Sequence, residues 1–127
     1  MSILRAPWWD ETLAVVPGGA GMVGEYLVRG LDEVADVLVI DPELKQDHEK
    51  HLPVPIERVP GTKLQDVFER SGKKRVVIFN LAAKVSGIGY NRLANYDMAT
   101  ANLSPQQAAV ERALYLQSVG IPVRLVQ

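Results

Sequence analysis

The 127-residue sequence contains no cysteine, which excludes disulfide bonds, thiolate metal sites and cysteine nucleophiles. It also lacks a dominant charge, because 14 Lys and Arg residues stand against 15 Asp and Glu residues, for a formal charge of −1. Such a balance gives no electrostatic signal for nucleic acid or for an anionic membrane. We therefore expect a nucleotide-like small molecule as ligand, with no nucleic acid and no membrane as partner.

Long hydrophobic runs are absent as well. No apolar run approaches the roughly 20 residues that a transmembrane helix needs. Pro7 and Asp10 interrupt the start of the chain, which has no signal-peptide core. Together with the lack of cysteine, this predicts a cytoplasmic protein. Hydrophobic residues make up 47% of the chain, so we expect one folded domain over residues 1–127, with residues 1–12 as an N-terminal arm.

Short β-branched runs, bounded by Gly, Pro or Asp, give the first positive signal. Continuous apolar runs of this kind are typical of strands that are buried on both faces of a parallel sheet. They predict strands at residues 13–16, 37–40, 76–81 and 123–126. A weaker run at residues 56–59 alternates with charged residues and predicts a further strand at the sheet edge.

Helix signals fall between these runs. Val23, Leu27 and Leu31 recur every four residues and predict one apolar stripe on a helix over residues 22–31. Residues 42–52 are charged throughout and predict a short exposed helix or an irregular loop. Strands alternating with helices indicate a Rossmann-like α/β fold, a three-layer doubly wound parallel sheet of about five strands. We expect the strand order 3-2-1-4-5.

Two capping-box patterns mark further helix starts. Thr62 begins one, with an apolar face of Leu64, Val67 and Phe68. Ser104, followed by Pro105, begins the other. Its predicted buried face consists of Ala109, Val110, Ala113, Leu114 and Leu116, and Gly120 ends the helix.

The sharpest motif is a glycine loop between the first predicted strand and the first predicted helix. Gly18, Gly21 and Gly24 have the spacing G-x-x-G-x-x-G. In dinucleotide-binding loops the first glycine permits a tight turn, the second lets the backbone approach a pyrophosphate, and the third lets the helix pack on the strand. Free N–H groups at the helix start then favour phosphates. The predicted loop comprises Gly18, Gly19, Ala20, Gly21, Met22, Val23 and Gly24.

Asp41 ends the second predicted strand, 17 residues after Gly24. A carboxylate there accepts hydrogen bonds from both ribose hydroxyls of an adenosine and repels a 2′-phosphate, so NAD is expected rather than NADP. The plainer interpretation is a glycine-rich turn whose Asp only caps the next segment. The preceding strand, the following helix and the acidic residue together favour dinucleotide binding.

These motifs resemble the extended short-chain dehydrogenase/reductase family, the NAD-dependent epimerases and dehydratases of nucleotide sugars. The loop PGGAGMVG, from Pro17 to Gly24, is similar to the family's T-G-G-A-G-F-I-G. NLAAKVSGIG, from Asn80 to Gly89, resembles its H-L-A-A segment. That stretch is similar to the AAKVGGI-like sequence of the GDP-fucose synthase and GDP-mannose 3,5-epimerase branch. Asn102 falls where the family places a structural Asn.

The resemblance implies further site residues after the fourth predicted strand. A small alanine pair lets the backbone approach the nicotinamide ribose, which assigns Leu81, Ala82, Ala83 and Lys84 to cofactor binding. The glycine-rich turn that follows lines the nucleotide-sugar site, which assigns Val85, Ser86, Gly87 and Ile88 to substrate binding. Lys84 fits a phosphate or carboxylate contact and a solvated loop position equally well.

Four departures from the family pattern stand out. Pro17 replaces the family's Thr, Gly61 and Thr62 stand where an Asp usually meets the adenine, and Ser104-Pro105 interrupts the fourth helix. The sequence also ends at Gln127, before the family's catalytic Ser and its Y-x-x-x-K helix. None of the four tyrosines is followed by Lys four residues later. We therefore expect no catalytic residue in this chain and a truncated, inactive relative that lacks the C-terminal region.

Two other groups of residues carry weaker signals. His48 and His51, with Asp47 and Glu49, would give a metal site without a clear third ligand, so a solvated surface segment is favoured. The aromatic pair at positions 8 and 9 is expected to cover one end of the core, with partner docking as the alternative.

Three functions are compatible with these residues. The first is an NAD-binding module with no redox catalysis of its own. The second is a structural or interaction protein, accessory or viral, that retains the Rossmann shell without a ligand. The third is part of an enzyme that another chain completes. Residues 123–126 are expected to leave an open strand edge, where a second copy or a different protein pairs.

Overall fold

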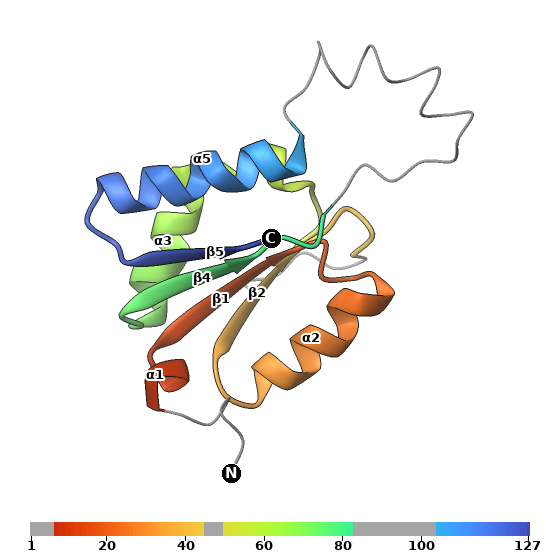
Figure 1. The fold of residues 1–127 in the computed structure, drawn as a ribbon, viewed down its shortest axis with the longest axis horizontal. Helices are drawn as coiled ribbons and strands as arrows, with labels where there is room; N and C mark the ends of the chain where they lie inside the picture. Colours follow the sequence, from red (N-terminus) through yellow and green to blue (C-terminus); the bar gives the residue numbers. More distant parts are fainter. Residues whose placement is uncertain (1–6, 45–49, 83–103) are drawn as a thin grey trace.

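In a computed structural model, which describes residues 7–44, 50–82 and 104–127, the strands form one five-stranded sheet (Figure 1). Its order is β3-β2-β1-β4-β5, which confirms the predicted 3-2-1-4-5 topology, and all neighbouring strands are parallel. The strands are β1 (Thr12–Pro17), β2 (Asp36–Ile40), β3 (His51–Leu52), β4 (Arg75–Phe79) and β5 (Val123–Val126).

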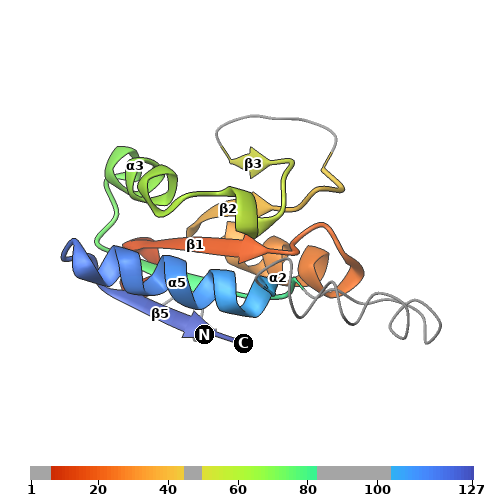
Figure 2. The ribbon, with the colours of Figure 1, turned by 90° about the horizontal axis from the view of Figure 1, so that it is seen from above.

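Helices cover both faces of the sheet, so the predicted three-layer α/β architecture is also confirmed. Helix α2 (Met22–Asp32) lies on one face, and α3 (Gly61–Ser71) and α5 (Pro105–Ser118) lie together on the other (Figure 2). Alternate strand residues supply the two cores. The core under α3 and α5 takes Leu13, Val15, Leu38, Ile40, Val76 and Ile78, and the core under α2 takes Ala14, Val16, Val37 and Val39.

The short helix α1 (Pro7–Asp10) carries the two tryptophans against the sheet, as expected for core cover. The Trp9 ring stacks on Phe79, with ring centroids 6.2 Å apart, and packs against the core under α2. The Trp8 ring lies beneath two guanidinium groups, those of Arg75 at 4.7 Å and Arg124 at 5.9 Å from its centroid. These contacts hold the start of the chain close to β4 and β5.

Residues 56–59 do not form the predicted edge strand. They form the 3-10 helix η2 (Ile56–Arg58), and the edge strand is the earlier β3. Prolines at positions 53, 55 and 60 surround the segment, and a proline offers no N–H to a strand ladder. Ile56 and Val59 are both buried in the same core, and the Val59 N–H donates to the Ile56 carbonyl at 3.0 Å. The spacing of the two apolar residues therefore belongs to a helical turn.

The fourth strand is shorter than predicted, since β4 ends at Phe79 rather than at residue 81. Asn80 N–H still donates to the Val126 carbonyl and Leu81 N–H to the Pro17 carbonyl, each at 2.9 Å. Because those acceptors are the last residues of β5 and β1, no partners remain for a longer ladder. Of residues 42–52, those described before position 45 form a turn and the last two form β3; positions 45–49 lie outside the described residues.

The apolar face of α2 differs from the predicted stripe at its first turn. Leu31 is buried and Leu27 packs against the core, but the Val23 side chain is 70% exposed. In the first turn, Gly24 is the residue that faces the glycine loop, and Val23 is therefore rotated outward by about one helical position, roughly 100°.

Helix α5 also buries a different face from the predicted one. Ala109, Ala113 and Leu116 are buried as expected, but Leu114 is 59% exposed and Val110 is at the surface. Ala108 takes part in the core in their place. Because apolar residues lie all around this helix, its own periodicity does not indicate which side meets the sheet.

The two capping predictions have different outcomes. Ser104 caps α5 as predicted: its hydroxyl accepts from Gln107 N–H, and its own N–H donates to the Gln107 side-chain oxygen, each at 3.1 Å. Gly120, at φ +89°, follows the end of α5 as predicted. Thr62 does not cap α3, because the helix already begins at Gly61, directly after Pro60. The Pro60 ring favours the extended conformation that precedes a helix, so Thr62 lies inside the first turn.

Candidate functional site

The ends of three strands meet at the glycine loop. Gly18, the first residue after β1, donates its N–H to the Ile40 carbonyl at the end of β2, at 2.8 Å. On the other side, Leu81 N–H donates to the Pro17 carbonyl at 2.9 Å. The chain leaves β1 toward β2 on one side and returns as β4 on the other, so the loop lies at a topological switch point. In open parallel sheets, ligands bind at this position, outside the carboxyl ends of the strands.

Two glycines of the loop are required by the fold itself. Gly18 has φ +80°, and a Cβ placed there would lie 2.6 Å from the Ala82 nitrogen. A Cβ on Gly24 would lie 2.6 Å from Gly19 Cα and 2.7 Å from the Gly18 carbonyl oxygen. The first position lets the β4 end approach the loop, and the second lets α2 pack directly on it.

Gly21 is different, because the fold alone does not require a glycine there. Its φ is −75°, which any residue adopts, and within the described residues a Cβ would meet nothing closer than the Gly18 oxygen at 3.7 Å. Gly21 is the N-cap of α2, and within the described chain no side chain caps this helix end. Among the described residues, the first-turn N–H groups of this 11-residue helix therefore receive no side-chain cap, and they lie beside an exposed glycine.

Asp41 joins the end of β2 to the loop. Its side chain is buried, with 7% exposed, and its carboxylate accepts from Ala20 N–H at 3.0 Å and from Glu43 N–H at 2.9 Å. The Glu43 contact fits the plainer interpretation of Asp41 as a turn former, and the Ala20 contact fixes the loop. A carboxylate has about four acceptor positions, so these two bonds leave capacity for ligand hydroxyls.

Some of the other predicted site residues lie at or near the loop, and the rest lie outside the described ranges. Met22 and Val23 are exposed at the start of α2, at 82% and 70%, and Leu81 and Ala82 lie beside Gly18. Gly19 is packed beneath the loop, where a Cβ would lie 2.8 Å from a Val39 methyl. Predicted residues outside the described part of the chain are Ala83, Lys84, Val85, Ser86, Gly87 and Ile88, and also Asn102.

Two further residues near the loop are not among the predicted site residues. Tyr26 is 75% exposed and continues the apolar surface that Met22 and Val23 begin. The Asn80 side-chain oxygen accepts from Ala82 N–H at 3.3 Å and thereby shapes the segment that touches Gly18. The i, i+4 spacing of Met22 and Tyr26 would have indicated a shared helix face.

Metal and membrane features can be stated for the described ranges. Within residues 7–44, 50–82 and 104–127, no group of three His, Cys, Asp or Glu side chains is arranged to hold a metal ion. His48, Asp47 and Glu49 lie outside these ranges. None of the helices in the described parts is long and apolar enough to cross a bilayer.

A family model described as the NAD dependent epimerase/dehydratase family matches residues 14–127. Among solved structures, UDP-glucose 4-epimerase from Thermotoga maritima, determined with UDP-glucose, is similar over 87% of this chain and 35% of its own, with 20% identity and a TM-score of 0.54. A short chain dehydrogenase from Leptospira borgpetersenii with bound NAD+ is similar over 94% of this chain and 52% of its own, with 14% identity and a TM-score of 0.52.

The chain thus spans about a third of one similar structure and about half of the other. At these identities the two structures establish the fold. A comparison with curated proteins gave no match.

Proposed function

The chain belongs to the NAD dependent epimerase/dehydratase family, and we propose that it binds NAD at the loop between β1 and α2. The family prediction made from the glycine loop and the residues after β4 is confirmed at this level. The predicted cofactor is also the one that the family description names. The narrower resemblance to the GDP-fucose synthase branch remains a prediction, because its residues 83–88 lie outside the described ranges.

Gly21 carries the proposal, and the surrounding groups fit the cofactor. A pyrophosphate at the start of α2 would accept hydrogen bonds from the first-turn N–H groups, and the missing side chain of Gly21 leaves room for it. The Asp41 carboxylate, beside the loop, would accept from the adenosine ribose hydroxyls. NAD, when bound, supplies hydride transfer; the residues of the loop and Asp41 hold and orient it.

We propose further that the 127-residue chain alone has no epimerase, dehydratase or reductase activity. Its sequence contains no Y-x-x-x-K pair to supply the general acid for hydride chemistry. A nucleotide sugar is the proposed second ligand, by analogy with the UDP-glucose of the similar epimerase structure. Turnover of GDP- or UDP-sugars with NAD, reproducibly above that of a heat-inactivated sample, would contradict the lack of activity.

A binding or structural partner is the second candidate, and the open edge of the sheet favours it. In the described sheet β5 pairs with β4 only, so its other side is available to a strand from a second copy or from a different protein. Such pairing would suit an interaction protein that has kept the Rossmann shell, or an enzyme that another chain completes. It is also compatible with NAD binding.

Calorimetric titration with NAD tests the proposed cofactor site. We expect saturable binding by the natural chain and at least tenfold weaker binding by Gly21→Ala, whose methyl group would occupy the space proposed for the pyrophosphate. The fold of that variant should persist, because its Cβ has no close neighbour in the part of the chain that the structure describes. Absence of NAD binding by the natural chain, or equal binding by a folded Gly21→Ala, would contradict the proposed site.

A further inference from the structure

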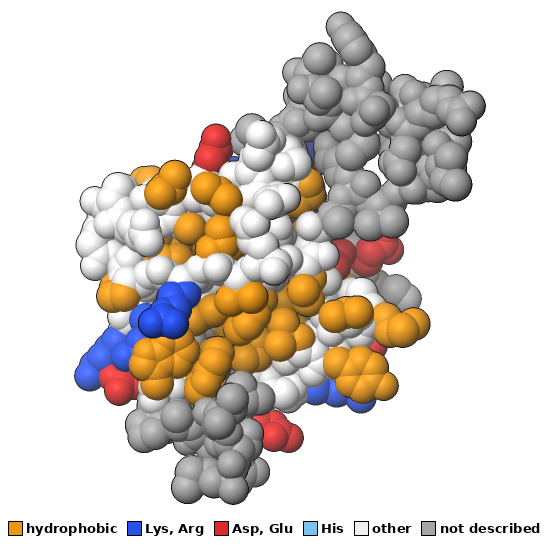
Figure 3. Space-filling view, viewed as in Figure 1, with side chains coloured by type: hydrophobic (Ala, Val, Ile, Leu, Met, Phe, Trp, Pro, Cys, Tyr) orange, Lys and Arg blue, Asp and Glu red, His pale blue; other side chains and the backbone are white. Residues whose placement is uncertain are grey.

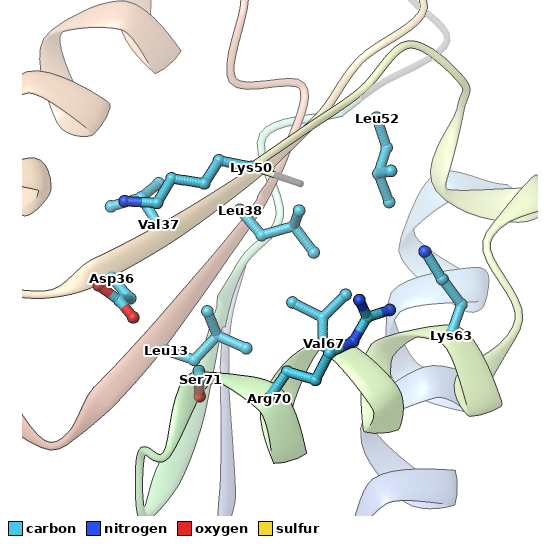
Figure 4. A pocket seen from close by; sticks show the side chains of 10 residues that line it. All are labelled: Leu13, Asp36, Val37, Leu38, Lys50, Leu52, Lys63, Val67, Arg70 and Ser71. Atoms are coloured by element: carbon cyan, nitrogen blue, oxygen red, sulfur yellow. The ribbon is translucent and has the colours of Figure 1, made fainter. Parts of the chain in front are cut away.

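A second concave site lies on the α3 side of β2. A cavity of about 430 Å³ runs along the first halves of β1 and β2 and beneath α3 (Figure 4). The glycine loop, by contrast, follows the end of β1, so the cavity is separate from the proposed NAD site. Its lining residues are Leu13, Asp36, Val37, Leu38, Lys50, Leu52, Lys63, Val67, Arg70 and Ser71.

The cavity combines an aliphatic floor with a cationic rim. Leu13 and Leu38 are buried in the core, and Val67 of α3 packs against the same core. Figure 4 shows these aliphatic side chains in the middle, with Lys63 and Arg70 on the α3 side and Lys50 on the β2 side. The volume is within the range of small-molecule sites, roughly 300–1,000 Å³.

Positively charged side chains are concentrated around this cavity, although the chain as a whole has nearly equal numbers of positive and negative residues. Three cations line the cavity and Asp36 is the only carboxylate among its described lining residues, although the chain as a whole has a formal charge of −1. Asp66 forms an ion pair with Arg70, and the hydrogen bond from Arg70 lowers the pKa of the Asp66 carboxyl. Since Arg70 is paired in this way, Lys63 of the same helix supplies the further positive charge on the α3 side of the cavity.

We propose that this cavity binds a small amphipathic anion, a carboxylate attached to a short aliphatic chain. The aliphatic part would contact Leu38 and Val67 and lose water-exposed surface. The carboxylate would lie on the α3 side of the rim, beside Lys63 and Arg70, which favour it over a neutral head group of the same size; Lys50 extends toward Asp36 instead (Figure 4). A nucleotide is a poorer fit, because its polar base and ribose would meet the aliphatic floor.

Octanoate is a suitable probe, and amide chemical shifts of the intact ¹⁵N-labelled chain locate where it binds. We expect saturable shifts in β2 and α3, with the glycine loop unaffected. Octanamide lacks the negative charge of octanoate, and acetate lacks its aliphatic tail. Each should bind at least tenfold more weakly than octanoate. Saturating NAD should leave octanoate binding unchanged, so this result does not depend on the proposed cofactor site.

Charge variants complete the test. Lys63→Gln should weaken octanoate binding about threefold, the size expected for one partly solvated ion pair, and added salt should reduce the difference. Arg58→Gln removes an exposed cation that does not line the cavity and should bind like the natural chain. Shifts centred on the glycine loop, equal binding of octanamide, or no saturable binding at all would overturn the proposal. Circular dichroism of both variants confirms that they are folded.

Discussion

At the scale of single residues, the loop glycines have separate physical tasks. A Cβ on Gly18 or Gly24 would meet backbone atoms, whereas a Cβ on Gly21, at the start of α2, would have only the Gly18 oxygen within 4 Å among the described residues. Sequence spacing alone treats the three as equivalent. The structure separates glycines that the fold requires from one, Gly21, whose place would accept a side chain without a close contact among the described residues.

Replacing Gly24 with Ala should therefore destabilise the fold, whatever the cofactor does. The new Cβ would lie 2.6 Å from Gly19 Cα, so α2 must move away from the loop. We expect a loss of about 2–3 kcal/mol in the free energy of unfolding, measured with urea. Gly21→Ala is the matched control and should lose less than about 1 kcal/mol, the usual effect of alanine at a helix N-cap. Equal losses of stability in the two variants would mean that α2 does not pack closely on the loop at Gly24.

Asp41 should determine the preference for NAD over NADP. Its carboxylate would repel a 2′-phosphate, so we expect NAD to bind about tenfold more tightly, or ~1.4 kcal/mol. Asp41→Ala should remove the preference. It should also lower stability by roughly 1–3 kcal/mol, because Ala20 and Glu43 N–H groups lose their charged acceptor.

A matched variant separates these two effects of Asp41. Asp41→Asn keeps one acceptor oxygen and removes the charge, so it should lose the cofactor preference with a smaller loss of stability. Calorimetry with both cofactors, together with urea unfolding, measures the two quantities. If the natural chain bound NAD and NADP equally, the role of Asp41 in cofactor choice would be wrong.

At the scale of elements, the two candidate caps give a paired test. Ser104→Ala removes the hydroxyl that accepts from Gln107 N–H at the start of α5, leaves the backbone N–H bond to the Gln107 side chain, and should cost about 1 kcal/mol. Thr62→Ala should be neutral or slightly stabilising, because Thr62 lies inside α3 and alanine is the better helix former. Thermal unfolding of both variants distinguishes them. A larger loss of stability for Thr62→Ala than for Ser104→Ala would indicate that Thr62 caps α3 after all.

The elements also show what the sequence could predict. Strands β1 and β2 are recognisable because runs such as Val15-Val16 and Val37–Ile40 are continuously apolar, as is typical of a strand buried on both faces. The glycine loop and Asp41 follow directly from those strand ends. Since neighbouring parallel strands end at the same edge of a sheet, the amino-acid pattern is enough to predict that the loop and the carboxylate lie side by side.

Other features depend on contacts that no local pattern contains. Strand β3 is two residues long and exists because His51 and Leu52 pair with β2. The exposure of Val23 depends on Gly24 facing the loop, and that of Leu114 depends on which side of α5 meets the sheet. Periodicity identifies a helix, but the position of the neighbouring element decides which apolar residues it buries.

At the scale of the whole molecule, apolar side chains are exposed on the β5 side of the described sheet. In Figure 3, viewed from the same side as Figure 1, hydrophobic side chains gather between α5 and α2. Val126 of β5 is 46% exposed, and Phe79 beside it is only partly buried. The Gln117 side chain donates to the Val123 carbonyl at 3.5 Å, a long bond that protects little of the strand edge.

We therefore predict that the protein is not a monomer at micromolar concentrations. A symmetric pair through β5 would satisfy the open strand edge and cover the apolar side chains beside it. Light scattering across a concentration series should show a dimer, and Val126→Lys should shift it to monomer by placing charge at the contact.

Val126 is chosen for this variant rather than its neighbour Leu125, because Leu125 packs against the core under α3 and α5. Leu114→Lys is the matched control, since Leu114 is exposed on α5 rather than on the strand edge, and it should remain a dimer. A natural chain that is monomeric at every concentration would show that β5 does not pair with a second copy, and a strand from a different protein would then be the partner to seek.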